Sequence, residues 1–226
     1  MATALDRTPR PSTEETRVRI ILAAERLFGE QGIESAALRA VSKAARQGNT
    51  AGVQYHFKDR LGLLNAIFEY REAQLDAIRR GIMERARTTG QASDIRWLLR
   101  ACFYPNFKLF MDHDGLPYIR LHFQYLSNLR PRGVLHPVDR DSPSTVHLRE
   151  TMRLMKRKLN FLNERQFSMR LEAVGSMFLS AVMQLAARPE EPALDSVVHY
   201  PSFFENLLEM MAAAMTVPPW DYSELR

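Results

Sequence analysis

The fold is decided by one stretch of the chain, residues 39–64, which reads RAVSKAARQGNTAGVQYHFKDRLGLL. This stretch contains two short helical patterns. Val41 and Ala44 can face inward on the first helix, because residues three apart share one face of an α-helix. Val53 and Phe57 lie four residues apart and share one face of the second helix. Each short helix therefore has an apolar side to bury and a polar side to expose.

A polar break, Gln47-Gly48-Asn49-Thr50, separates the two helical patterns. Gly48 supplies the backbone freedom for a sharp turn, and Asn49 or Thr50 can cap the helix that follows. Two helices joined by a tight turn, the second with a polar outer face, form the layout of a helix-turn-helix. The second helix of that motif enters the major groove of DNA. The stretch therefore predicts a DNA-binding element.

The sequence on both sides of this stretch is also helical. Apolar residues recur at three- and four-residue spacing from Thr16 to Gln31, and Gly32 is placed to end that helix. Ser35 can cap the next helix, and Asp59 can cap one that continues to about Arg87. No strand-like alternation of useful length appears, so we expect these elements to form a three-helix head.

The rest of the chain predicts a larger helical body. Helical spacing recurs over about residues 93–103, 117–129, 148–162, 167–185 and 202–215. We expect Pro105 to interrupt the first of these helices and residues 131–144, with three prolines, to form an ordered or mobile surface loop. The prediction is an all-α protein of about nine helices, with a flexible arm over residues 1–15, the head over 16–62 and the body over 63–226.

The composition is that of an ordinary globular protein with a basic balance. The chain has 226 residues, 46% of them hydrophobic and 25% charged, and a net charge of +5. Such a charge permits a polyanionic partner but is too common to prove one. Cys102 is the single cysteine, which rules out an intrachain disulfide and suits a reducing cytoplasm. No apolar run is long enough for a membrane span, so we expect a cytoplasmic protein without a membrane partner.

These motifs follow one another in the same order as in the members of a known family. Leu27-Phe28 is followed by Gln31-Gly32, then by a helix, a turn and QYHFKDRLGLL at residues 54–64. This arrangement resembles the N-terminal domain of the TetR family of transcriptional repressors. Members of that family have a helix ending in LF-x-x-x-G, an apolar and alanine-rich helix, and a Y-x-H/Y-F-x-x-K-x-x-L signature. The match covers roughly residues 16–68, and the helix count and length of the body fit the family.

Four residues align directly with the signature, namely His56, Phe57, Arg60 and Leu63, with arginine in place of the common lysine. Gln54 occupies the usual tyrosine position, and Tyr55 follows one place later. The turn, Ala45-Arg46-Gln47-Gly48-Asn49, is one residue longer than is usual in the family. The resemblance implies the family's fold and operator binding, without giving the operator sequence.

Polar and cationic residues of the head are our candidates for DNA contacts. They are Arg39, Arg46, Asn49, Thr50, Gln54, Tyr55, His56, Lys58 and Arg60. Lys58 and Arg60 flank a helix N-terminus, where backbone amides add positive potential, and form a plausible phosphate clamp. Asn49 and Thr50 could instead only cap the helix, and His56 could pack into the head. Arg7, Arg10 and Arg17 are weaker candidates for the neighbouring groove.

The resemblance implies a pocket in the body for a small-molecule effector. Candidate lining residues, for which plain core packing is the alternative, are Trp97, Cys102, Phe103, Phe107, Phe110, Phe123 and Tyr125. One recognition helix reads only a few base pairs, so we also expect a homodimer on a palindromic site. Candidate interface residues on the last two helices are Phe167, Leu171, Val174, Phe178, Val182, Phe203, Leu207 and Met211.

Other functions fit the sequence less well. We expect no enzyme, cofactor or metal site, because the usual phosphate, dinucleotide, zinc-protease and serine-hydrolase motifs are missing and the six histidines are scattered. The run Asp112-His113-Asp114 is explained by turn chemistry. The basic residues between Arg149 and Lys158 flank an apolar stripe, which indicates a solvated helix face rather than a second nucleic-acid surface. The remaining alternative is a helical adaptor that binds protein partners, which would leave the polar turn and the basic clamp of the head unexplained.

Overall fold

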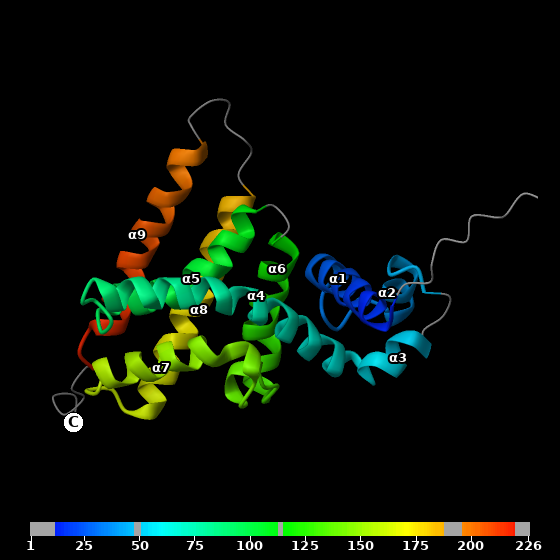
Figure 1. The fold of residues 1–226 in the computed structure, drawn as a ribbon, viewed down its shortest axis with the longest axis horizontal. Helices are drawn as coiled ribbons and strands as arrows, with labels where there is room; N and C mark the ends of the chain where they lie inside the picture. Colours follow the sequence, from blue (N-terminus) through cyan, green and yellow to red (C-terminus); the bar gives the residue numbers. More distant parts are fainter. Residues whose placement is uncertain (1–11, 48–50, 113–114, 188–195, 220–226) are drawn as a thin grey trace, which may run out of the picture.

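The computed structural model describes residues 12–47, 51–112, 115–187 and 196–219. Within these ranges the chain is all-helical, as predicted, with nine α-helices and no strand. Figure 1 shows α1–α3 at one end and the remaining helices packed beside them. The helices are α1 (Thr13–Gln31), α2 (Leu38–Ala44), α3 (Ala51–Phe57), α4 (Arg60–Thr88), α5 (Ile95–Met111), α6 (Leu116–Gln124), α7 (Val146–Lys158), α8 (Glu164–Ala186) and α9 (Ser196–Thr216).

Some predicted residues lie outside the described ranges. These are the turn residues Gly48, Asn49 and Thr50, the arm arginines Arg7 and Arg10, and His113 and Asp114. No described helix is both long and apolar enough to cross a membrane.

The head forms largely as its sequence pattern predicts. Val41, Val53 and Phe57 are buried, and Gly32 ends α1 at a φ of +102°. The inward assignment of Ala44 was wrong, because Ala44 is exposed and Ala45, at 2% exposure, fills that place.

The start of α2 also differs from the prediction. Ser35 does not cap this helix, which begins three residues later with Ala37 at its N-cap and no side-chain hydrogen bond there. The cap predicted at Asp59 is confirmed, since its carboxylate accepts a hydrogen bond from the backbone N–H of Gly62 at the start of α4.

Helix α4 leaves the head and runs through the body as one continuous helix of 29 residues (Figure 1). Near its head end it is tied to α1 by a buried ion pair. Arg71 donates from Nε and Nη2 to the two carboxylate oxygens of Glu25 at 2.6 and 2.7 Å, and both side chains are almost fully buried. Because each oxygen has its own donor, the desolvation cost of the pair is offset by a fully hydrogen-bonded geometry.

Helices α1 and α6 lie in close contact. A Cβ atom added at Gly29 would lie 2.3 Å from the carbonyl oxygen of Pro117, so the approach is possible only because Gly29 has no side chain. Tyr118 and Leu121 of α6 belong to the same apolar cluster as the core of the head. The apolar cluster therefore crosses the predicted head–body boundary, and that boundary remains a prediction.

The prediction that Pro105 interrupts its helix was wrong. Helix α5 continues through Pro105 to Met111. A proline in a helix removes one N–H and leaves the carbonyl of the residue four places earlier without a partner. That residue is Ala101, and its carbonyl accepts a hydrogen bond from Arg79 Nε of α4 at 3.0 Å. A side chain from another helix thus satisfies the group that the proline leaves unpaired.

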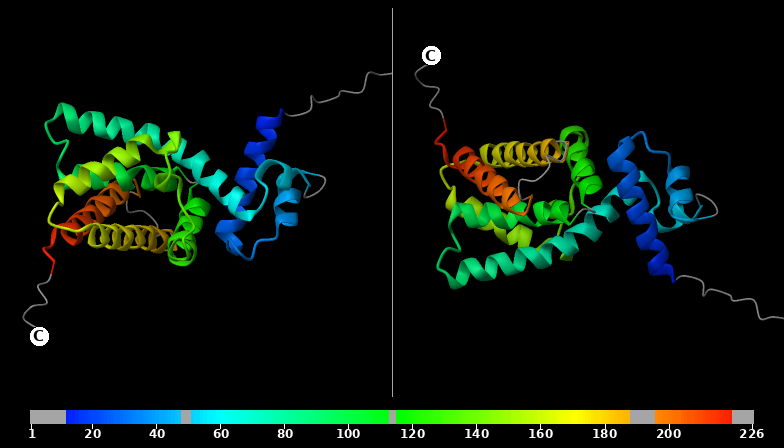
Figure 2. Two further views of the ribbon diagram at one scale, coloured as in Figure 1. Left: turned by 90° about the horizontal axis from the view of Figure 1, so that it is seen from below. Right: turned by 90° about the horizontal axis from the view of Figure 1, so that it is seen from above.

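The segment over residues 131–144 is ordered and partly buried. After α6 the chain makes a π-helical turn over Tyr125–Leu129, followed by three short 3-10 turns that lead into α7. His136 within it is only 4% exposed, so it packs against the body and is more than a surface loop. Figure 2 shows the last two helices, α8 and α9, on the side of the body away from α4.

Candidate nucleic-acid interface and body cavity

Helix α3 presents a polar face to solvent. Tyr55 is 84% exposed, and Gln54 and Lys58 are exposed as well. On the opposite side of the same short helix, Val53 and Phe57 are buried in the core of the head. The apolar residues thus fix the helix, and the amide, phenol and ammonium groups are free to meet a ligand as large as a nucleic acid.

The residues next to this face have mixed positions. Arg39 and Arg46 are exposed, whereas His56 is half-buried with its ring against those of Tyr55 and Phe57. The Arg17 guanidinium lies 5.4 Å from the centroid of the Phe57 ring.

Arg60 makes contacts inside the head. Its Nη1 donates to the carbonyls of Ile33 and Ala36, at 2.6 Å each, and its guanidinium lies over the Phe28 ring. These bonds connect the start of α4 to the segment that precedes α2. Its position gives Arg60 a structural role, and a phosphate contact by Arg60 remains a prediction.

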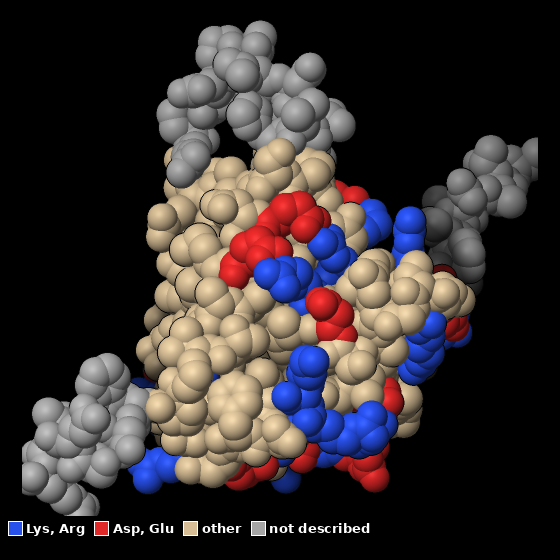
Figure 3. All heavy atoms as spheres, turned by 90° about the vertical axis from the view of Figure 1, so that its left-hand side faces the viewer, with Lys and Arg blue, Asp and Glu red and all other residues tan. Residues whose placement is uncertain are grey.

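The basic residues of α7 are mostly paired. Arg149, Arg153 and Lys156 lie within 4.0 Å of Asp141, Glu150 and Glu164 respectively. Figure 3 shows the end of the body opposite the head. Much of this surface is uncharged, and its basic and acidic side chains lie next to one another. The pairing of these residues fits the interpretation of α7 as a solvated face.

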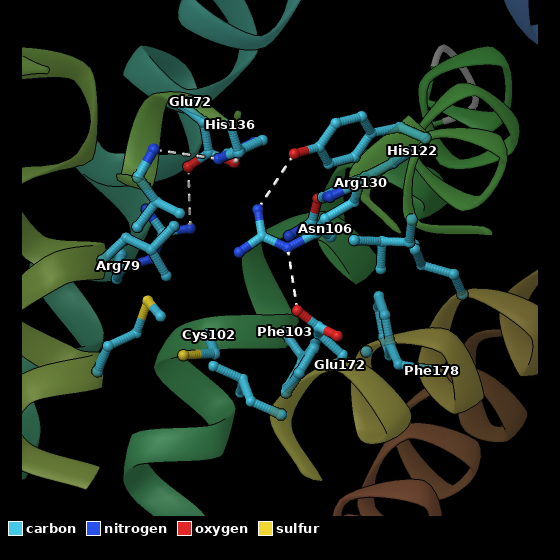
Figure 4. Close-up of a pocket in the computed structure, with 18 residues that line it drawn as sticks. Glu72, Arg79, Cys102, Phe103, Asn106, His122, Arg130, His136, Glu172 and Phe178 are labelled. Atoms are coloured by element: carbon cyan, nitrogen blue, oxygen red, sulfur yellow. Dashed lines mark hydrogen bonds and ion pairs between the residues drawn. The ribbon is translucent and has the colours of Figure 1, made fainter. Parts of the chain in front are cut away.

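A cavity of about 130 Å³ lies inside the body between α4, α5, α6, α7 and α8 and is partly open to solvent. Three of the seven predicted lining residues, Cys102, Phe103 and Tyr125, line it (Figure 4). The other four are not among the residues that line the cavity. These four are Trp97, Phe107, Phe110 and Phe123. Phe107 is fully buried, and its ring packs against those of Phe203 and Phe204. For Phe107, core packing was the correct alternative.

One end of the cavity is polar, which the sequence reasoning missed. Figure 4 shows the polar side chains around it, and those that line it are Glu72, Arg79, Asn106, His122, Arg130, His136 and Glu172. A signal was present for two of them. Glu72 and Arg79 lie on the stripe of α4 that also carries Phe68, Leu75 and Met83, where a helix normally buries apolar residues.

Burial controls the charge of this polar end. It lowers the pKa of His122 to about 4, and it lowers the pKa of His136 as well, so both rings are neutral at neutral pH. Burial raises the pKa of the Glu72 carboxyl, an effect that nearby Arg79 opposes. Burial also raises the pKa of the Cys102 thiol to about 12, as expected for a structural cysteine.

Most of the predicted dimer residues are buried within the chain's own core. Their exposed fractions are at most 4%, and they are Phe167, Val174, Phe178, Val182, Leu207 and Met211. A stripe already covered by its own chain has little area left to offer a partner, so an interface role for these side chains remains a prediction. Leu171 and Phe178 line the body cavity instead. Phe203 is half-buried and borders a surface groove between α8 and α9.

Comparisons with known proteins support the interpretation of the head. No protein-family model matches the chain. A curated relative, the HTH-type transcriptional regulator AcrR of Shigella flexneri, is 40% identical over 70 residues, which are 30% of this chain. The match spans about a third (32%) of the relative's own length.

Three solved structures resemble the chain at low sequence identity. A HlyIIR mutant shares 16% identity at a TM-score of 0.43, over 92% of this chain and 99% of the other. AibR in complex with isovaleryl coenzyme A and operator DNA shares 18% sequence identity at a TM-score of 0.47, over 91% of this chain and 100% of the other. A TetR-family regulator from Streptomyces coelicolor A3 shares 17% sequence identity at a TM-score of 0.40, over 93% of this chain and 100% of the other. The signature residues His56 and Phe57 lie on α3 and Leu63 lies on α4, and over 70 residues the chain is similar to an HTH-type transcriptional regulator.

Proposed function

We propose that this chain is a ligand-responsive transcriptional repressor that acts in the cytoplasm. It binds palindromic operator DNA as a homodimer and releases it when a small molecule enters the body cavity. The observation that carries the proposal is the outer face of α3. There Gln54, Tyr55 and Lys58 are exposed, and the apolar residues of the same helix hold it on the head. Lys58 would contact phosphate, and Gln54 would contact base edges.

A second copy of the chain would dock on the groove between α8 and α9. This groove is lined by Met177, Ser180, Ala181, Gln184, Phe203, Asn206, Leu207 and Met210. Met210 is 53% exposed, and small side chains at Ser180 and Ala181 would allow two helices to approach closely. An isologous pairing of this groove would present two α3 helices to one palindromic site.

Helix α6 offers a physical link between the cavity and the head. His122 and Tyr125 line the cavity, and Gln124 between them contacts the end of α1. The Gln124 side chain accepts from the Ile33 N–H at 3.0 Å and donates to the carbonyls of Phe28 and Gly29 at 3.3 Å each. A ligand that shifts α6 would therefore shift the head, provided that it binds the DNA-free conformation more tightly.

The function is tested by titrating the protein against DNA from its own promoter region in a fluorescence assay. We expect binding that prefers one site over random duplex and weakens steeply with salt, because phosphate contacts release counterions. Binding without sequence preference, or without salt dependence, would contradict the proposal. A protein-binding adaptor, the alternative, would show no DNA affinity at all.

A further inference from the structure

The polar end of the body cavity holds most of the unpartnered buried polar atoms found in the described parts of the chain. Across the described residues, seven buried side-chain nitrogen and oxygen atoms lack a hydrogen-bond partner. Five of these atoms belong to residues that line this cavity. They are Glu72 Oε2, Arg79 Nη2, Asn106 Oδ1, His122 Nδ1 and His136 Nε2. Such atoms are costly to bury, so their concentration at one place indicates a site for a polar group of a ligand.

The two arginines at this end are already neutralised. Arg79 donates to Asp76 at 3.0 Å and to the Ala101 carbonyl, and its Nη2 lies 3.4 Å from Glu72 Oε2 without hydrogen-bonding geometry. Arg130 is paired with both oxygens of Asp139 at 2.6 and 2.9 Å and also lies 3.3 Å from Glu172. Each arginine thus faces two carboxylates, and an anionic ligand would find no free positive charge.

Two neutral side chains at this end, Asn106 and His136, each have a buried polar atom without a hydrogen-bond partner. Asn106 Oδ1 is an acceptor without a partner. His136 Nδ1 accepts a hydrogen bond from the Val138 N–H at 3.2 Å, which places the ring proton on Nε2, facing Glu72 Oε1 at 3.9 Å. The Glu72 side chain is 1% exposed, and its Oε2 has no hydrogen-bond partner although Arg79 Nη2 lies 3.4 Å away. A positively charged donor would satisfy both Glu72 and Asn106.

The other end of the cavity is apolar. Phe103 and Phe178 lie with ring centroids 5.2 Å apart, and Leu148, Met152, Leu171 and Leu179 complete the wall. This end suits a hydrocarbon or aromatic portion of a ligand.

We propose that the cavity binds an apolar organic amine in its protonated form, with the ammonium group between Glu72 and Asn106 and the apolar portion against Phe103 and Phe178. This inference rests on the proposed ligand-responsive function and names the class of effector. Glu72 makes the cavity prefer an amine over a neutral ligand of the same shape, because a charge-assisted hydrogen bond in a buried site is stronger than a neutral one.

The test compares three probes of the same apolar portion, phenylbutylamine, phenylbutanol and phenylbutanoate, by calorimetric titration of the full chain at neutral pH. We expect the amine to bind at least about tenfold more tightly than the alcohol, and the carboxylate not to bind. Glu72→Gln should abolish the preference for the amine while alcohol binding is retained, which also shows that the variant is folded. The control Glu164→Gln, which removes an exposed surface carboxylate, should leave all three affinities unchanged.

Several outcomes would overturn the inference: equal binding of amine and alcohol, preferential binding of the carboxylate, or no binding of any probe because water alone satisfies the polar atoms. A parallel DNA titration without probe separates this result from the proposed function. DNA binding without amine binding refutes the ligand class only. Amine binding without any DNA binding refutes the repressor function and leaves the ligand class standing.

Discussion

The outer face of α3 and the polar end of the body cavity both gather polar side chains, under opposite physical conditions. At α3 the groups are exposed, and water satisfies them until a partner arrives, so they cost the folded state little. In the cavity, groups such as Asn106 Oδ1 and His136 Nε2 are buried without partners, at a cost that the rest of the fold must offset. An exposed face can meet a large polyanion, whereas a buried polar pocket selects a small molecule by its hydrogen bonds. Four predictions test this difference.

The largest effect is expected from two matched buried carboxylates. Glu25→Gln should lower the free energy of unfolding by about 3 kcal/mol, because it leaves the buried Arg71 guanidinium without its counterion. Glu72→Gln should lower it by less than about 1 kcal/mol, since Glu72 has an oxygen without a hydrogen bond and burial already disfavours its charge. Urea unfolding of the two variants measures both values. Equal losses would mean that the cavity end is as well satisfied as the α1–α4 ion pair.

The second prediction uses pH. His122 is neutral in the folded state, where burial lowers its pKa to about 4, but in the unfolded chain it titrates near its ordinary value of 6.5. The unfolded state therefore binds more protons between these values, and stability falls as the pH drops below 6.5. His122→Phe removes this loss and should gain about 2 kcal/mol relative to the original protein between pH 7 and pH 5.

The raised pKa of Glu72 acts in the opposite direction, but it is common to both proteins and cancels in their difference. Urea midpoints at the two pH values provide the measurement. If the variant and the original protein lose stability in parallel, then His122 is charged or solvated in the fold.

The third prediction concerns the exposed face. Lys58→Ala should weaken binding to all duplexes by a similar factor, up to about tenfold, and reduce the salt slope by about one, whereas Gln54→Ala should change the preference among sequences. Fluorescence titrations against the operator, its single-base variants and random duplex distinguish these effects. Residue 58 has a positive φ, which is as unfavourable for alanine as for lysine, so Lys58→Ala does not change the backbone strain.

Lys158→Ala, on the exposed end of α7, is the control for the third prediction and should leave DNA affinity unchanged. If Lys158→Ala weakens binding as much as Lys58→Ala, then α7 is part of the nucleic-acid surface. If Lys58→Ala and Gln54→Ala act alike, the division between phosphate and base contacts is wrong.

The fourth prediction concerns the contact between the head and the body. Gln124→Ala should cost about 1 kcal/mol, since it leaves the Ile33 N–H and two carbonyls without this partner. The variant should still bind DNA and ligand, but ligand should no longer release the DNA. Gln91→Ala, in the turn between α4 and α5, is the matched control and should respond normally. Normal release by Gln124→Ala would show that coupling takes another route.

The sequence predicted the head better than the body because the signals of the head are local. The spacing of Val53 and Phe57 alone determines which side of α3 is buried, and the cap at Asp59 is found two residues beyond Phe57. The same local reasoning failed at Pro105, because the partner that satisfies the Ala101 carbonyl comes from Arg79, 22 residues earlier in the chain. The polar end of the cavity likewise depends on side chains from α4, α5, α6 and α8 and from the segment between α6 and α7.

The burial of most predicted dimer residues within their own chain has a related cause. A stripe such as Phe167, Val174 and Phe178 shows that a helix face is buried, but its pattern does not tell whether the cover is the same chain or a second copy. Only the tertiary arrangement shows that α8 turns this stripe inward and leaves a groove beside Met177 and Met210.

The inward position of Arg60 has a consequence for how the head would move. Its guanidinium holds the carbonyls of Ile33 and Ala36, so the first turn of α4 and the connector before α2 are fastened together. A swing of α4 would carry the DNA-reading helices along as one rigid piece. In the proposed dimeric repressor, DNA would then be released by a change in the spacing and tilt of two intact heads, without unfolding of either.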